Sequence, residues 1–113
     1  MVRELLASAY AAFNRRDIDG ALSAMRPDVE WANGLEGGFV WGHEGVRTYW
    51  TRQWQIIDPH VEPITFTQDV AGRVVVSVHQ IVRDVTGKVS DDRVVTHRYT
   101  LVEGLVARME IVD

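Results

Sequence analysis

The hydrophobic pattern of this chain changes its period at Val61, and that change limits the fold more than any other feature of the sequence. After this point apolar and polar residues alternate with period two, which is typical of β-strands with one buried face. Dipeptides that favour tight turns interrupt the alternation at Ala71-Gly72, Thr86-Gly87 and Glu103-Gly104. The pattern predicts a meander of four long antiparallel strands, at residues 61–70, 73–85, 88–102 and 105–112.

The first half of the chain shows helical spacing instead. Apolar residues recur three and four positions apart, which predicts helices over residues 2–14, from the N-cap residue Asp17, and from Gly42 to about Asp58, where Pro59 stops the helix. Short strands are predicted at residues 28–31 and 39–41.

A helical half followed by a strand-rich half is the pattern of an α+β fold. We expect three N-terminal helices packed in the concavity of a strongly curved, mostly antiparallel sheet. Together they would form a cone with a pocket that opens near the glycine-rich loop at residues 34–42. At 113 residues the chain is expected to be a single domain, residues 1–113.

Composition argues against several classes of function. The chain has no cysteine, its net charge is −4 without a basic stripe, and its four histidines show no metal-ligand spacing. It has no glycine-rich nucleotide loop, no apolar run that could span a bilayer, and an N-terminus unlike a signal peptide. We therefore expect a cytoplasmic protein that needs no cofactor or metal and binds neither nucleic acid nor membrane.

The turns predict which side chains share a face of the sheet. A two-residue turn at Glu103-Gly104 pairs Val102 with Leu105, and then His97 with Glu110 and Tyr99 with Arg108. A two-residue turn at Thr86-Gly87 adds Val76, opposite His97, and Val78, opposite Val95. This valine-rich face is predicted to lie under the helices.

The other face and the first hairpin are less constrained. The outer face carries Ser77, His79, Thr96, Arg98 and Thr100, and we expect it to form a homodimer contact. At Ala71-Gly72 a two-residue turn would place Ile64 and Phe66 outside, whereas a three-residue loop would place them inside. Burial of both side chains favours the three-residue loop.

The predicted inner face gathers His97, Tyr99, Arg108 and Glu110, and Tyr10 approaches them from the first helix. Polar groups in a dry core need partners, because each unpaired one costs about 1–3 kcal/mol. The cluster must either satisfy itself or line a wet cavity. Large aromatic side chains would wall such a cavity: Phe13, Trp31, Tyr49, Trp50 and Trp54.

Three segments carry a resemblance to a known family: YAAFNRRDIDGALSAMRPDVEW, WGHEGVRTYW and HRYTLVEGLVARMEIVD. The chain resembles the SnoaL-like and ketosteroid isomerase-like group of the nuclear transport factor two-like superfamily over nearly its whole length. The resemblance implies that Tyr10 is an oxyanion-hole donor and that His97 stands at the second donor position. The general-base position is Trp31, so ketosteroid isomerase activity is not expected, and Glu110 is the candidate replacement base.

Two functions remain open at this point. In the first, the chain is a cofactor-independent isomerase, cyclase or hydrolase that acts on a small apolar molecule by general acid–base chemistry. Its catalytic residues would be Tyr10, His97 and Glu110, and its ligand-binding residues Phe13, Trp31, Trp50, Trp54, Tyr99 and Arg108. In the second, it is a non-catalytic ligand-binding or structural module in which Arg108 neutralises Glu110 and the aromatic residues are core. A cavity of several hundred Å³ that exposes His97 and Glu110 would favour the enzyme.

Overall fold

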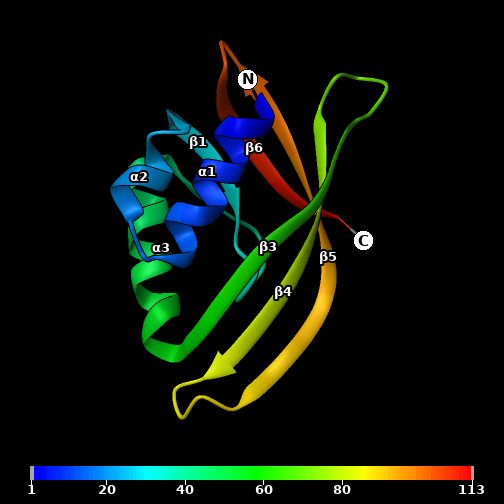
Figure 1. Cartoon of the computed structure of the whole chain (residues 1–113). Helices are drawn as coiled ribbons and strands as arrows, with labels where there is room; N and C mark the ends of the chain where they lie inside the picture. Colours follow the sequence, from blue (N-terminus) through cyan, green and yellow to red (C-terminus); the bar gives the residue numbers. More distant parts are fainter. Residues whose placement is uncertain (1, 113) are drawn as a thin grey trace.

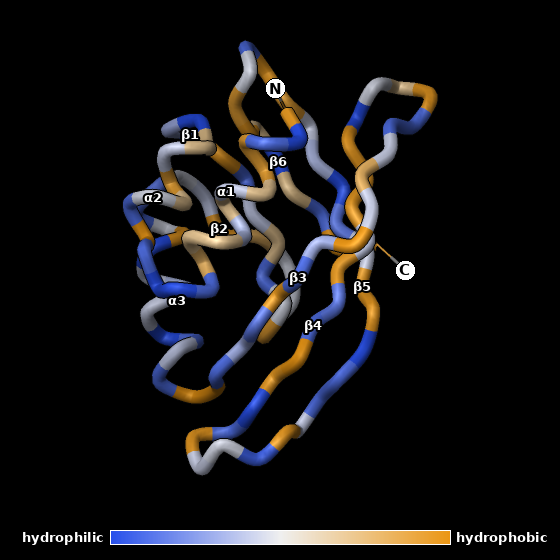
Figure 2. The backbone as a smooth tube through the Cα atoms, in the orientation of Figure 1, coloured by the Kyte–Doolittle hydropathy of each residue, from blue (hydrophilic) through white to orange (hydrophobic). Residues whose placement is uncertain are grey.

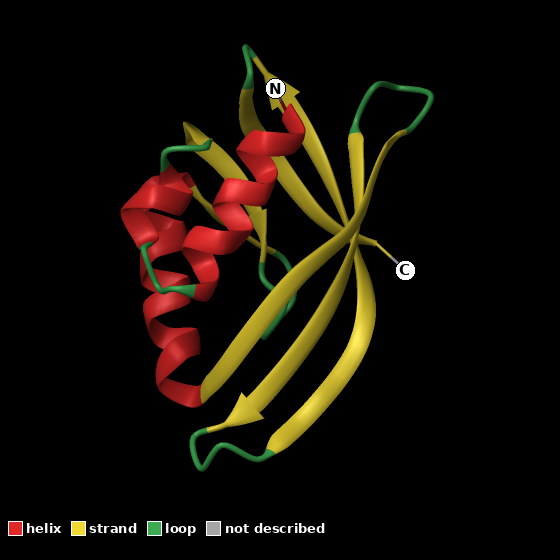
Figure 3. Ribbon diagram, viewed as in Figure 1, coloured by secondary structure: helices red, strands yellow, loops and turns green. Residues whose placement is uncertain are grey.

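The computed structural model describes residues 2–112, and its helices gather on one side of a curved sheet (Figures 1 and 3). The helices are α1 (Val2–Asn14), α2 (Ile18–Leu22) and α3 (Gly42–Ile56). The strands are β1 (Met25–Ala32), β2 (Phe39–Trp41), β3 (Ile57–Gln68), β4 (Val74–Asp84), β5 (Val89–Val102) and β6 (Leu105–Val112). Their order in the sheet is β2-β1-β6-β5-β4-β3, and all neighbours are antiparallel except β1 and β6. The predicted α+β cone is confirmed.

The core lies between the concave face of the sheet and the apolar stripes of the helices. Helix α1 buries Leu6 and Tyr10, and α3 buries Tyr49 and Trp50. Figure 2 shows hydrophobic residues interspersed with hydrophilic ones along β4 and β5, and burial alternates over residues 74–78 of β4, so one face of that strand packs on the core. Fully burying a valine such as Val76 stabilises the fold by roughly 1.5–3 kcal/mol.

The register of the β4–β5 hairpin agrees with the prediction, although its turn does not. Val76 pairs with His97 and Val78 with Val95. The amide of Asp84 donates to the carbonyl of Lys88 at 2.8 Å, so the loop has three residues rather than two. Ser90 is then unpaired on β5 and restores the predicted register as a β-bulge.

The β3–β4 hairpin has the predicted three-residue loop, closed by the Asp69 amide on the Arg73 carbonyl at 3.0 Å. Phe66 pairs with Val76 and packs against the core, as expected. The prediction for Ile64 is wrong, because this residue is a bulge in β3 and is 52% exposed.

The predicted inner face of β6 is also wrong. Val102 does pair with Leu105 across the Glu103-Gly104 turn, but the register then shifts between Thr100 and Leu101. Ala107 is the extra residue, and a one-residue shift moves every later side chain to the opposite face. His97 therefore lies opposite Ile111 and Tyr99 opposite Met109, whereas Arg108 and Glu110 belong to the outer face.

Helix α3 ends two residues earlier than predicted, and β3 begins at once. Ile57 is already extended, with φ −137° and ψ 165°, and Asp58 precedes a proline, which disfavours helical geometry. Pro59 therefore lies within β3 instead of stopping a helix. No helix among residues 2–112 is long and apolar enough to cross a membrane.

Strand β3 is an edge strand, and Asn14 covers part of its free edge. The Asn14 side chain donates to the Val61 carbonyl at 2.7 Å and accepts from the Val61 amide at 2.9 Å. Pro59 and Pro63, two positions away on either side, have no amide hydrogen to offer on that edge. This arrangement leaves little of the edge free to pair with another chain.

Replacing Asn14 with Leu is expected to lower the free energy of unfolding by about 1–3 kcal/mol, because both backbone groups of Val61 lose their partner. Urea unfolding measures the loss. The matched control is Arg15→Leu, directly after α1 with a side chain 59% exposed, which should change stability by no more than about 0.5 kcal/mol. Equal values for the two variants would contradict the edge-covering role.

Candidate functional site

A cavity lies between the concave face of the sheet and helices α1 and α3. It contains about 650 Å³ of atom-free space, including its opening to solvent, and the centres of water molecules can reach about 100 Å³ of it. Much of its lining is apolar or aromatic, and no Asp, Glu, Lys or Arg among residues 2–112 contributes to it. The polar side chains that line it are Tyr10, Tyr49, Gln53, Gln80, His97 and Tyr99.

Three of these side chains form one hydrogen-bonded row. The Tyr99 hydroxyl donates to the Tyr10 hydroxyl oxygen at 2.7 Å, and the Tyr10 oxygen lies 2.8 Å from Nδ1 of His97. All three side chains are buried, with His97 7% exposed. Tyr10 reaches into the core because α1 crosses the sheet at this point, and its hydroxyl has partners there.

Burial determines the protonation state of this row. It lowers the pKa of His97 from 6.5 to about 4, because the charged imidazolium loses its hydration and no carboxylate among residues 2–112 lines the cavity to stabilise the charge. Burial likewise raises the pKa values of Tyr10 and Tyr99, so both hydroxyls keep their protons. The row is uncharged at neutral pH.

The neutral imidazole of His97 carries one proton, on either Nδ1 or Nε2. Because the Tyr10 oxygen accepts from Tyr99, its own proton is available to Nδ1 of His97. When Tyr10 donates to Nδ1, the proton of the neutral ring lies on Nε2, which has no hydrogen-bond partner among residues 2–112. His97 thus has one nitrogen bonded to Tyr10 and, among residues 2–112, one nitrogen without a partner, and its side chain lines the cavity.

The aromatic residues named from the sequence divide into two groups. Phe13, Trp31 and Trp50 line the cavity, and the ring centroids of Trp31 and Trp50 are 5.6 Å apart in an edge-to-face contact. Trp54 does not line it. Its ring packs against Trp50 and Phe13 and lies 4.9 Å from the Arg16 guanidinium, so it supports the wall from behind.

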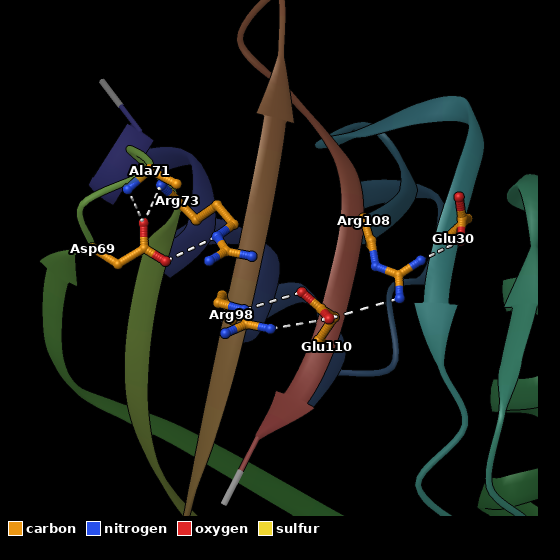
Figure 4. A network of polar contacts seen from close by, with 7 residues as sticks. All are labelled: Glu30, Asp69, Ala71, Arg73, Arg98, Arg108 and Glu110. Atoms are coloured by element: carbon orange, nitrogen blue, oxygen red, sulfur yellow. Dashed lines mark hydrogen bonds and ion pairs between the residues drawn. The ribbon is translucent and has the colours of Figure 1, made fainter.

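Arg108 and Glu110, predicted to belong to the site, lie on the other side of the sheet because of the bulge at Ala107. Figure 4 shows Glu110 between Arg98 and Arg108 in a network that ends at Glu30. Two hydrogen bonds of 3.1 Å from Arg98 hold the pKa of Glu110 below its ordinary value. Neither residue can reach a ligand next to His97.

The whole chain was also compared with known proteins. The family model of the SnoaL-like domain matches residues 6–109. The chain belongs to the SnoaL-like domain family. The resemblance seen in the sequence is therefore confirmed.

Solved structures resemble this SnoaL-like chain over nearly its full length. TerC, co-crystallised with polyporic acid, is 31% identical, with a TM-score of 0.85 and coverage of 98% of this chain and 89% of TerC. An NTF2-like protein of unknown function from Burkholderia pseudomallei is 27% identical, with a TM-score of 0.85 and coverage of 98% and 88%. The epoxide hydrolase/cyclase-like enzyme SalBIII is 16% identical, with a TM-score of 0.78 and coverage of 97% and 88%, and this likeness concerns the fold alone. No curated protein matches the chain.

Two polar residues of the SnoaL-like cavity were not predicted as site residues. Gln53 lies on α3 and Gln80 on β4, and both line the cavity. A signal for Gln53 was present in the sequence, since it is the one amide within the apolar stripe of α3 that also contains Trp50 and Trp54. A polar residue on a buried helix face indicates either a hydrogen-bond partner inside the protein or a ligand-binding site.

Proposed function

We propose that this chain binds a small, flat, mostly apolar molecule in the cavity and that neutral His97 donates a hydrogen bond from Nε2 to an oxygen of that molecule. The observation that carries the proposal is the row Tyr99–Tyr10–His97, which fixes Nδ1 and leaves Nε2 without a partner among residues 2–112. The lack of charged lining among the same residues favours an uncharged ligand. The co-crystallisation of TerC with polyporic acid supports a small organic ligand.

Chemically, such a donor polarises a carbonyl and stabilises negative charge that develops on its oxygen. A neutral imidazole is suited to this role, because it donates a hydrogen bond to the ligand and keeps its proton. The row of hydroxyls behind it strengthens the donor, since each hydrogen bond polarises the next. The site therefore supports an isomerase, cyclase or hydrolase that activates an oxygen.

A purely binding function is the alternative, and one observation favours it. No carboxylate or lysine among residues 2–112 lines the cavity, so a general base other than His97 is missing from its wall. Glu110, the candidate base, lies in the network on the outer face instead. Homodimerisation through that face, and a cytoplasmic location, stay predictions.

Binding of 2-acetylnaphthalene, an uncharged flat ketone, tests the proposal. Calorimetry should show binding to the wild-type protein, and infrared spectra should show the bound carbonyl stretch at lower frequency than in hexane. His97→Leu should weaken binding about tenfold, the equivalent of one hydrogen bond of about 1.4 kcal/mol, and abolish the frequency shift. His79→Gln, on the outer face, is the matched control. Equal affinity and an equal shift in wild type and His97→Leu would refute the proposal.

A further inference from the structure

A second polar spot lies on the helix side of the cavity, at Tyr49 and Gln53 on α3 and Gly34 in the loop after β1. Three buried side-chain atoms among residues 2–112 have no hydrogen-bond partner: Arg52 Nε, Gln53 Oε1 and Trp54 Nε1. Of these residues only Gln53 lines the cavity. A buried amide oxygen without a partner is unfavourable, and it calls for a ligand or a water.

The Tyr49 hydroxyl next to it has a proton without an acceptor, whereas Gln53 has an acceptor without a proton. Its oxygen accepts from the Gly34 amide at 3.0 Å and from Nε2 of Gln53 at 3.2 Å. Burial raises the pKa of Tyr49, so the hydroxyl keeps its proton, and that proton has no acceptor among residues 2–112. The spot therefore offers one free donor, from Tyr49, and one free acceptor, Oε1 of Gln53.

The backbone at Gly34 keeps this spot open. A Cβ atom at this position would lie 3.3 Å from Cδ1 of Ile111 and 3.7 Å from the Tyr49 hydroxyl. Glycine thus lets the loop approach closely enough for its amide to bond Tyr49. The Tyr49 oxygen has its acceptor capacity used by Gly34 and Gln53, which directs its proton to another group.

The chemistry of the spot selects the group that fits it. A hydroxyl accepts from Tyr49 and donates to Gln53 Oε1 at the same time, whereas an ether or ketone oxygen only accepts. A carboxylate would face Oε1 without any cation on the cavity wall to offset its charge. The spot lies on α3 and the loop after β1, while His97 and Tyr99 lie on β5.

We propose that Tyr49 and Gln53 form a hydroxyl subsite, so that the ligand carries a neutral hydroxyl group away from the oxygen bound by His97. This inference rests on the proposed function, because it extends the same cavity. The ligand class is then a flat, hydroxylated ketone or a related molecule with one acceptor oxygen and one hydroxyl.

The test compares four probes by calorimetry: 2-acetylnaphthalene, its 6-hydroxy and 7-hydroxy derivatives, and its 6-methoxy derivative. In the wild-type protein at least one hydroxy derivative should bind about tenfold more tightly than 2-acetylnaphthalene, and the methoxy derivative should show no such gain. Gln53→Leu should reduce this gain, measured as the ratio of the two affinities in the same variant, to less than about twofold. Gln55→Leu, at an exposed position of the same helix, should keep the gain.

The outcomes separate the two proposals. If 2-acetylnaphthalene binds through His97 but neither hydroxyl improves affinity, the subsite is wrong and the proposed function stands. A gain that persists in Gln53→Leu also overturns the subsite. If Gln53→Leu does not fold, the comparison of hydroxy and methoxy probes on the wild-type protein decides, and equal affinities overturn the inference. If no probe binds the wild-type protein, both proposals fail.

Discussion

Acidification from pH 7 to pH 4 is expected to remove about 3 kcal/mol of stability through His97 alone, about 2 kcal/mol of it above pH 5. The folded protein holds the pKa of this histidine at about 4, whereas its ordinary value is 6.5. Between these values the unfolded chain binds a proton that the folded chain does not. Stability therefore falls as the pH drops through this window and is fully present above pH 7.

Among residues 2–112, no carboxylate lines the cavity of His97 to offset its protonation. Its ring is hydrogen-bonded to the Tyr10 hydroxyl and packs against the rings of Tyr10 and Tyr99. Carboxylates with lowered pKa values, such as Asp69 and Glu110, also stabilise the fold. Their contribution is lost at lower pH, since it is present above their ordinary values near 4 and disappears as the pH falls further.

Urea unfolding at pH 7, 6 and 5 measures this effect in wild type, His97→Gln and His79→Gln. The glutamine at position 97 can still bond Tyr10 but does not titrate, so this variant should lose most of the pH dependence. His79 lies on the outer face with a side chain 41% exposed, and its replacement should keep the wild-type slope. A wild-type slope that survives in His97→Gln would show that His97 is not the buried neutral histidine described here.

Replacing Trp50 with Ala is expected to destabilise the protein by about 3–5 kcal/mol. Trp50 is 3% exposed and contacts Phe13, Trp31 and Trp54, so its removal leaves a void that the neighbouring rings cannot fill. The residue therefore belongs both to the core and to the cavity wall. A core role and a ligand-binding role of these aromatic residues do not exclude each other.

Trp41→Ala is the matched control, because this tryptophan ends the short strand β2 with 63% of its surface exposed. Its loss should change the free energy of unfolding by no more than about 0.5 kcal/mol. Chemical denaturation of both variants compares them directly. A cost below about 1 kcal/mol for Trp50→Ala would mean that the aromatic wall does not support the fold as its packing indicates.

Sequence patterns predicted the architecture well because period and turn chemistry are local properties. The helix over Val2–Asn14 and the strands Phe39–Trp41 and Leu105–Val112 have the expected bounds. The pairing of Val76 with His97 followed from counting residues across one turn. It held because Ser90, an extra residue on β5, compensates for the longer loop.

The candidate site was predicted in part, and its two charged residues were misplaced for one reason. Tyr10, His97 and Tyr99 meet as expected, because the predicted register between β4 and β5 is correct. Arg108 and Glu110 do not join them, because the bulge at Ala107 inverts the faces of β6 after Val106. Nothing in the local sequence marks Ala107 as a bulge, since the position is set by how β6 packs beside β1 and β5.

The central claim is that His97 is neutral inside the cavity and carries its proton on Nε2. Nitrogen NMR of the histidine side chains tests it most directly, with the His97 signals assigned by their loss in His97→Gln. The account predicts a neutral ring protonated at Nε2 from pH 7.5 down to about pH 5, with a titration midpoint of about 4. A midpoint near 6.5, or a neutral ring protonated at Nδ1, would contradict it.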